Sequence, residues 1–280
     1  MKNLSRYIKN IKYQHSTKIA NWLVELSTYK AKRILKESEP IGVLVDNTVL
    51  SHATTHKTTW IHTGLKPWGD HNVETGYLAR TPVYSSKAKT REYDDISYLP
   101  SLFSLQRAGL LNFYSSSELY NERFYQPVGR FRGYGYLDSN FFENRPLKII
   151  DQNTFPCLGP SWMELPSSQE QLIQRLKKME IEDPLYASLV KVLGRKNSQD
   201  AWHIRTAEKY GLYCFLTMDF KLIKTLEAQR KSPRIITLKT SIMTPAMLGK
   251  KLRLYPMPPK ILSYTNVTPA HSNVADIEKK

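Results

Sequence analysis

Four runs of apolar and β-branched residues stand out along a chain whose other segments are largely polar. The clearest is IGVLVD at 41–46, a continuous apolar run of strand length that ends on one acid, Asp46. Such a run predicts a strand that is buried on both faces, as in the centre of a parallel sheet. Further strands are expected at 110–116, 213–219 and 234–240, and a short one at 148–150.

Helical patterns separate these strands. Ser167 and Glu170 have the spacing of a capping box, and Asp183 followed by Pro184 is typical of a helix start, with Gly194 as the stop. Other helices are expected at 95–109, 117–124, 200–211 and 220–230. The alternation of strands and helices predicts an α/β domain with a central parallel sheet.

The remaining segments suggest additions to this domain. Residues 1–40 carry nine Lys or Arg against three Glu, and Ile19, Trp22 and Leu26 predict an amphipathic helix that starts near Ser16 or Thr17 and ends near Pro40, packed on the core. The core domain would span 41–250, with polar insertions without a clear period near 51–95 and 126–166. Residues 251–280 contain four prolines and predict a surface tail.

Charge and composition narrow the partners. The 280 residues include 41 Lys or Arg and 25 Asp or Glu, a formal net charge of +16 that favours a polyanionic partner. Two separated cysteines, Cys157 and Cys214, argue against a disulfide framework or a cysteine zinc site. No signal peptide or long apolar run is present in the sequence, so we expect a cytoplasmic protein without a membrane partner.

Several acids follow predicted strands. Asp46 ends the first strand, Asp219 ends the 213–219 strand, Asp200 begins the helix before it, and Glu118 and Glu122 follow the 110–116 strand. Because functional groups of parallel sheets collect beyond the carboxyl ends of the strands, we expect these carboxylates to converge. Their mutual repulsion favours a divalent cation between them, and an all-oxygen ligand set suits Mg²⁺ or Mn²⁺. This chemistry is typical of metal-dependent nucleases.

Three segments resemble PIN-domain ribonucleases. VLVDNTVLSHA (43–53) is similar to their opening strand, DAWHIRTAEKYGLYCFLTMDFKL (200–222) to an Asp-led helix, a Gly turn and a strand ending in Thr-x-Asp, and RIITLKTSIMTPAML (234–248) to their last strand and helix. The resemblance implies a PIN-like three-layer α/β/α sandwich whose carboxylate pocket binds Mg²⁺ or Mn²⁺ and hydrolyses RNA, mostly single-stranded.

The resemblance also assigns roles to residues. Asp46, Asp200 and Asp219 take metal-ligand positions, and the second acid is Glu122, with Glu118 as a close rival. Polar positions that orient water, the acids or the substrate in the family match Thr217, Asn47 and Thr48. His203, one helical turn after Asp200, would reach the pocket, but a packing role on the helix face fits it better.

RFRGYGY (130–136) joins Arg130 and Arg132 to aromatic residues, a combination that binds phosphates and stacks unpaired bases. The leading hypothesis is a metal-dependent endoribonuclease. The alternatives are a catalytically inactive RNA-binding scaffold on the same fold and a structure-specific DNA nuclease. The resemblance also leaves open an antitoxin or another protein as a partner.

Overall fold

The structure, a computed structural model, describes residues 2–84, 90–125, 138–143, 147–155 and 164–257, with side chains described from residue 18 onward and not at position 80. Its elements, in chain order, are α1 (Lys2–Leu35), β1 (Ile41–Val45), α2 (Asn47–His52), β2 (Thr54–Trp68), β3 (His71–Pro82), α3 (Arg91–Ser97), α4 (Leu99–Arg107), β4 (Leu111–Ser115), α5 (Ser117–Tyr125), β5 (Ser139–Asn140), β6 (Lys148–Ile149), α6 (Ser168–Glu182), α7 (Pro184–Leu193), a 3₁₀ turn (Arg195–Asn197), α8 (Ser198–Lys209), β7 (Cys214–Leu216), α9 (Phe220–Ala228), α10 (Pro233–Ile236), β8 (Ser241–Met243) and α11 (Pro245–Lys251).

The predicted parallel sheet is confirmed. Five strands lie in the order β6-β4-β1-β7-β8, and every neighbouring pair is parallel. Strand β1 is central: Ile41 is in register with Leu111 of β4, and Val43 with Cys214 of β7. The chain goes from β1 to β4 on one side and later to β7 on the other, so the sheet changes direction beside β1. Ligands of open α/β sheets bind at such a switch point, beyond the carboxyl ends of the strands.

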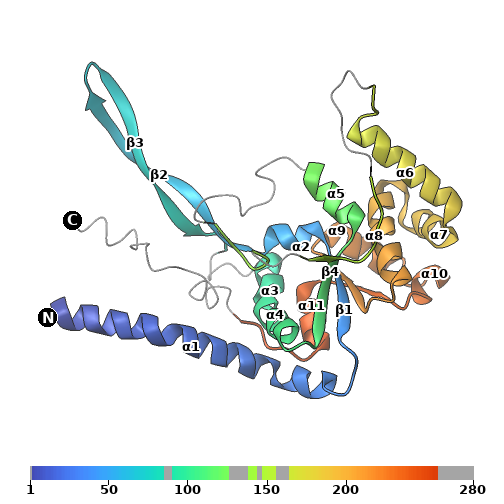
Figure 1. The fold of residues 1–280 in the computed structure, drawn as a ribbon, viewed down its shortest axis with the longest axis horizontal. Helices are drawn as coiled ribbons and strands as arrows, with labels where there is room; N and C mark the ends of the chain where they lie inside the picture. The colour runs from blue at the N-terminus through green and yellow to red at the C-terminus, as the bar shows by residue number, and fades with distance from the viewer. Residues whose placement is uncertain (1, 85–89, 126–137, 144–146, 156–163, 258–280) are drawn as a thin grey trace.

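Helices cover both faces of this sheet (Figure 1). Val43 and Val45 of β1 belong to a buried core that includes residues of α2, α3, α4 and α11. Leu44 points to the opposite face, where it belongs to a second core with residues of α5, α7, α8 and α9. Because successive side chains of a strand alternate between faces, the unbroken apolar run of β1 fills both cores. The architecture is a central parallel sheet flanked by helices.

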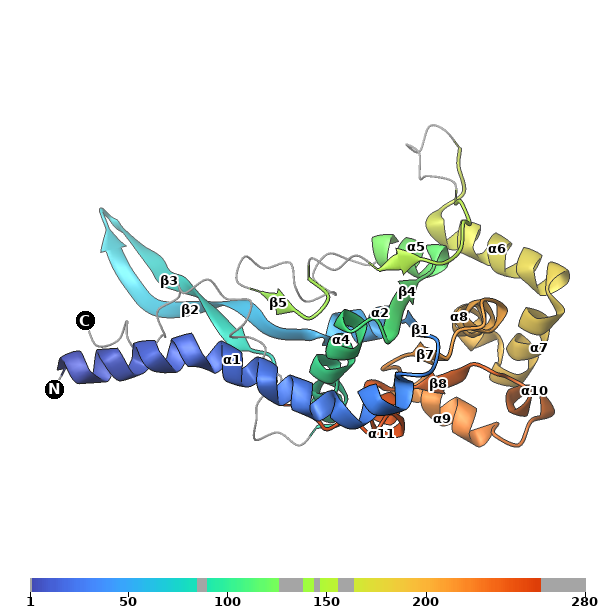
Figure 2. The same ribbon diagram turned by 60° about the horizontal axis from the view of Figure 1, so that its bottom comes forward.

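Helix α1 corrects two expectations. It runs from Lys2 rather than from Ser16 or Thr17, and in Figure 2 it extends well beyond the sheet domain. The predicted apolar face is also wrong, because Trp22 and Leu26 are exposed. The buried face carries smaller side chains, among them Ala31 and Ser27, whose hydroxyl lies 2.7 Å from that of Ser101 on α4. Small residues let the two helix backbones approach closely, so the large residues point outward.

The expectation of irregular loops at 51–95 is wrong. Most of this segment forms an antiparallel hairpin of β2 and β3, which projects from the domain in both views (Figures 1 and 2). A two-residue turn, Gly69–Asp70, joins the strands, and Gly69 has φ of +62°. Glycine takes this backbone conformation without a steric penalty, and a hairpin turn with glycine at its first central position is favoured.

The last strand also lies elsewhere than expected. Residues 234–240 do not form a strand: α10 starts at Pro233, and β8 occupies Ser241–Met243. Proline at the first helical position and Ser232 before it favour the helix despite the β-branched residues that follow. Before β8, the carboxylate of Glu208 accepts hydrogen bonds from the backbone N–H groups of Lys239 and Thr240, which fixes the entry to the strand.

The other predicted elements lie within a few residues of their expected positions, except that 95–109 is two helices, α3 and α4, which meet at Tyr98. Arg130 and Arg132 lie outside the described residues, as does the tail beyond Met257. In the described part of the chain, none of the helices combines the length and apolar character needed to cross a membrane.

Candidate functional site

A polar cavity of about 310 Å³ lies beyond the carboxyl end of β1, at the switch point of the sheet. The elements around it are far apart in sequence: α2 follows β1, α5 follows β4, α8 precedes β7, and Asp219 follows β7. The cavity is lined by Asp46, Asn47, Thr48, Ser51, His52, Glu122, Gln199, Asp200, His203 and Asp219. Four carboxylates that the sequence analysis singled out therefore line one space.

Asp46 is the most firmly held of these acids. It is buried, and its Oδ2 accepts hydrogen bonds from the hydroxyls of Thr48 at 2.5 Å and Thr217 at 2.6 Å. The same two hydroxyls accept the backbone N–H groups of Met218 and Asp219, so they connect the start of α2 to the end of β7. The two threonines therefore hold the carboxylate in one orientation.

The other two aspartates are held by helix starts. Asp219 caps α9: its Oδ1 accepts the backbone N–H groups of Lys221 and Leu222. Asp200 lies in the first turn of α8, where the helix dipole favours a negative charge. Because α8 leads into the parallel strand β7, its N-terminus lies at the carboxyl edge of the sheet, beside Asp46.

The structure separates Glu122 from Glu118. Glu122 lines the cavity, and its Oε2 accepts a hydrogen bond from Nδ2 of Asn47 at 3.0 Å. Glu118 lies one helical turn earlier, is fully buried, and forms an ion pair of 3.2 Å with Arg175 of α6 and a hydrogen bond with Gln199. Of the two rivals, Glu122 is the one at the cavity, and Glu118 joins α5 to α6 and α8.

Burial shifts the pKa of two cavity carboxyls, Asp46 and Asp200, upward. Burial raises the pKa of Asp46, and the hydrogen bonds from Thr48 and Thr217 only partly oppose this. Burial raises the pKa of Asp200 to about 6, and the charges of Asp46, Asp219 and Glu122 act in the same direction. The folded protein therefore holds these negative charges at a cost, which a cation in the cavity would relieve.

His203 lines the cavity, although the sequence favoured a packing role. Its Nε2 lies 3.6 Å from Oε2 of Glu122, and its ring is buried. Burial alone would lower the pKa of His203, but the contact with Glu122 and the charges of Asp46 and Asp200 raise it above the ordinary value. The carboxylates around His203 therefore favour the protonated form of its ring.

Sequence reasoning missed Ser51, His52 and Gln199 as cavity residues. Ser51 and His52 are one turn of α2 beyond Asn47 and Thr48, a periodicity that would have placed them on the same helix face. Gln199 carried no signal of its own, since it is a polar residue in a helix start.

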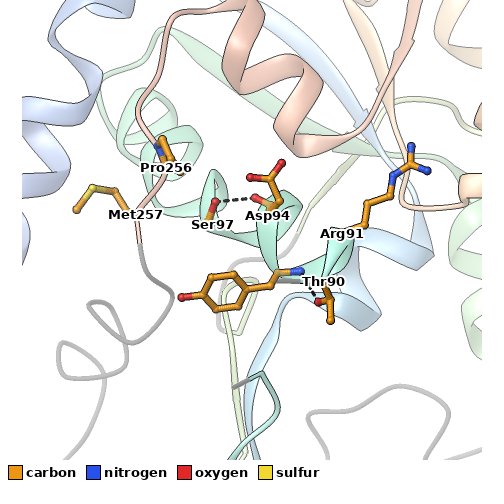
Figure 3. Close-up of a pocket in the computed structure, with 7 residues that line it drawn as sticks. Thr90, Arg91, Asp94, Ser97, Pro256 and Met257 are labelled. Atoms are coloured by element: carbon orange, nitrogen blue, oxygen red, sulfur yellow. Dashed lines mark hydrogen bonds between the residues drawn. The ribbon is translucent and has the colours of Figure 1, made fainter. Parts of the chain in front are cut away.

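A larger hollow of about 640 Å³ lies between α3 and the residues after α11 (Figure 3). Its two charged side chains contact neighbouring residues: the Arg91 guanidinium stacks 4.1 Å from the ring centre of Phe220, and Asp94 pairs with Lys250 at 3.4 Å. None of the site residues expected from the sequence lines it. The smaller, acidic cavity is therefore the candidate functional site.

The donor set of the acidic cavity fits a hard divalent cation. Four carboxylates, two side-chain amides and hydroxyls supply oxygen ligands, which Mg²⁺ and Mn²⁺ prefer. In the described part of the chain, however, no three His, Cys, Asp or Glu side chains stand close enough together to hold an ion as they are. Asp46, Glu122, Asp200 and Asp219 would have to move toward one another to coordinate one.

No protein-family model, curated protein or solved structure matches the chain. The class that the structure defines is thus an α/β protein with a five-stranded parallel sheet and an acidic cavity at its switch point.

Proposed function

We propose that the protein is a metal-dependent nuclease of PIN-like architecture that hydrolyses RNA. The observation that carries this proposal is the convergence of Asp46, Glu122, Asp200 and Asp219 from four separate segments on one cavity. Isolated acids at helix starts are ordinary caps, but four that share a cavity and repel one another are costly for the fold. Such a cost is typical of functional sites.

In this proposal the four carboxylates hold one or two Mg²⁺ or Mn²⁺ ions. A bound ion would neutralise charge on the phosphate oxygens and make water a stronger nucleophile at neutral pH. Thr48 and Thr217 keep the Asp46 carboxylate in one orientation, and Asn47 does the same for Glu122. No side chain of the protein has to form a bond to phosphorus.

The basic character of the chain supports a nucleic acid as the substrate. Four of the 25 Asp and Glu residues line the cavity, and the whole chain carries a net charge of +16, so the chain outside the cavity is still more basic. Phosphate binding by such a surface is independent of sequence and sensitive to salt. RNA rather than DNA is proposed on the PIN-like sequence segments alone.

The test is cleavage of labelled single-stranded RNA and, in parallel, single-stranded and duplex DNA with Mn²⁺. Wild type should cut RNA, and Asp46→Asn and Glu122→Gln should not. Lys178→Gln, a change at an exposed ion pair on α6, is the matched control and should cut like wild type. Cleavage of DNA alone would replace RNA by DNA in the proposal, and metal-independent RNA binding without cleavage would favour a non-catalytic scaffold.

A further inference from the structure

The β2–β3 hairpin is a long two-stranded ribbon with no obvious role in the sheet domain. Its strands have 15 and 12 residues, and it reaches away from the helices and the five-stranded sheet (Figures 1 and 2). Among the described residues it pairs with a further strand, β5, only at Thr54 and His56. An isolated two-stranded hairpin is marginally stable in water, so a ribbon of this length suggests an interaction surface.

Two tryptophans expose their rings on this ribbon. Trp68, at the turn, is 80% exposed, and Trp60, near the middle, is 45% exposed. Trp60 lies opposite Leu78 on β3, and Trp68 lies opposite His71. Because Leu78 and His71 are an odd number of residues apart on one strand, the two rings lie on opposite faces of the ribbon.

The Trp60 ring is held in place by the ribbon itself. A Cβ atom on Gly76 would lie only 2.5 Å from Cε2 of Trp60, so the indole covers Gly76 and any side chain there would displace it. His62 meets the same ring edge-on, with 6.2 Å between the ring centres. An aromatic ring fixed against the backbone with part of its surface in water is a preformed stacking platform.

The distribution of apolar and charged groups favours a nucleic acid over a flat protein surface. A protein interface would be served by one apolar face, whereas this ribbon carries an exposed tryptophan on each face. Along β2, the exposed Lys57 precedes Trp60, and the exposed Lys66 lies between Trp60 and Trp68. Lysines near aromatic rings pair phosphate binding with base stacking. The ribbon also starts two residues after His52, which lines the acidic cavity, so a strand bound to it would lead toward that cavity.

We propose that the β2–β3 hairpin is an arm that binds single-stranded RNA, with unpaired bases stacked on Trp60 and Trp68 and phosphates held by Lys57 and Lys66. The choice of RNA rests on the proposed function, which this inference deepens by giving the protein a substrate-binding element outside the cavity. Stacking tolerates any base, so the arm would bind RNA with little sequence preference.

The test measures binding without cleavage. All proteins carry Asp46→Asn and are kept in EDTA, and the probe is a fluorescein-labelled single-stranded RNA followed by fluorescence anisotropy. Trp60→Ala and Trp68→Ala should each weaken binding by about fivefold or more, which is the lower range for loss of one base–aromatic stack. Lys57→Gln with Lys66→Gln should flatten the salt dependence of the affinity.

Trp22→Ala is the matched control, because Trp22 is a 62% exposed tryptophan on α1, the other projecting element. It should leave RNA affinity unchanged. Circular dichroism and thermal melting of each variant check that the fold is retained, which is expected for side chains this exposed.

If the Trp60 and Trp68 variants bind RNA as tightly as the protein that carries Asp46→Asn alone, the hairpin is not an RNA-binding arm. Light scattering that shows a dimer which the two tryptophan variants convert to a monomer would also overturn the proposal, because the ribbon would then be an interface between copies. The two proposals can be refuted independently. If RNA binding depends on Trp60 and Trp68 but wild type shows no Mn²⁺-dependent cleavage, the RNA-binding arm is supported and the nuclease is refuted.

Discussion

Replacement of Asp200 by Asn should make the metal-free protein more stable while it abolishes cleavage. Asp200 lines the cavity together with three other carboxylates, and burial raises its pKa from 3.8 to about 6. Asparagine has nearly the same shape and no charge. The variant would therefore keep the packing of α8 and lose the repulsion.

The size of the effect follows from the pKa. Each pKa unit corresponds to about 1.4 kcal/mol, so the change in the pKa of Asp200 from 3.8 to about 6 corresponds to about 3 kcal/mol of unfolding free energy. This figure is a ceiling, because the half-buried side chain keeps contact with water in the cavity. For a chain of this size it equals a rise in Tm of at most about 6–12 °C.

The pH dependence has a definite sign. Between pH 3.8 and about 6 the folded protein binds more protons at Asp200 than the unfolded chain does, so its stability falls as the pH rises through this window. The stability difference between Asp200→Asn and wild type should be absent below this window, grow within it, and stay constant above about pH 7.

Urea denaturation in EDTA across this pH range measures the difference directly. Glu182→Gln, at an exposed pair with Lys178, is the control and should change stability by less than about 0.5 kcal/mol at every pH. Addition of Mn²⁺ should stabilise wild type and leave Asp200→Asn nearly unchanged. A variant no more stable than wild type at about pH 8, or a difference that does not grow with pH, would refute the reasoning.

Two further substitutions separate support from chemistry at this site. Glu118→Ala should destabilise the protein by about 3–5 kcal/mol, because it leaves the largely buried Arg175 without its carboxylate. Glu122→Gln should cost little stability and abolish cleavage. Urea denaturation and cleavage assays would contradict this if Glu122→Gln lost the stability and Glu118→Ala kept it. Thr217→Val should cost about 1–3 kcal/mol and weaken Mn²⁺ binding, because it removes the hydroxyl that donates to the buried Asp46; calorimetry that finds both unchanged would exclude this orienting role.

The parallel sheet could be predicted because its central strand is encoded locally. The run at 41–46 is apolar at every position that faces either core, and only a strand covered on both faces needs that pattern. The β2–β3 hairpin lacks such a signal. Most of it is exposed on both faces, so Thr and His replace the apolar alternation that marks a half-buried strand.

The site could be predicted only as far as chain order determines it. Asp46 and Asp219 could be singled out because each lies shortly after the carboxyl end of a strand of the parallel sheet, Asp46 directly after β1 and Asp219 three residues after the last residue of β7. The sequence favoured Glu122 but left Glu118 as a rival, because the ion pair of Glu118 involves Arg175, a residue of α6 more than fifty positions further along the chain. The contact of His203 with Glu122 could not be predicted either, because it forms only when α5 and α8 meet.

The central claim is that the acidic cavity binds a divalent ion, and Mn²⁺ titration followed by electron paramagnetic resonance tests it most directly. Wild type should remove Mn²⁺ from solution with saturation at one or two ions per protein molecule. Asp46→Asn should bind Mn²⁺ at least about tenfold more weakly. Equal Mn²⁺ uptake by both proteins, or no uptake by wild type, would contradict the claim.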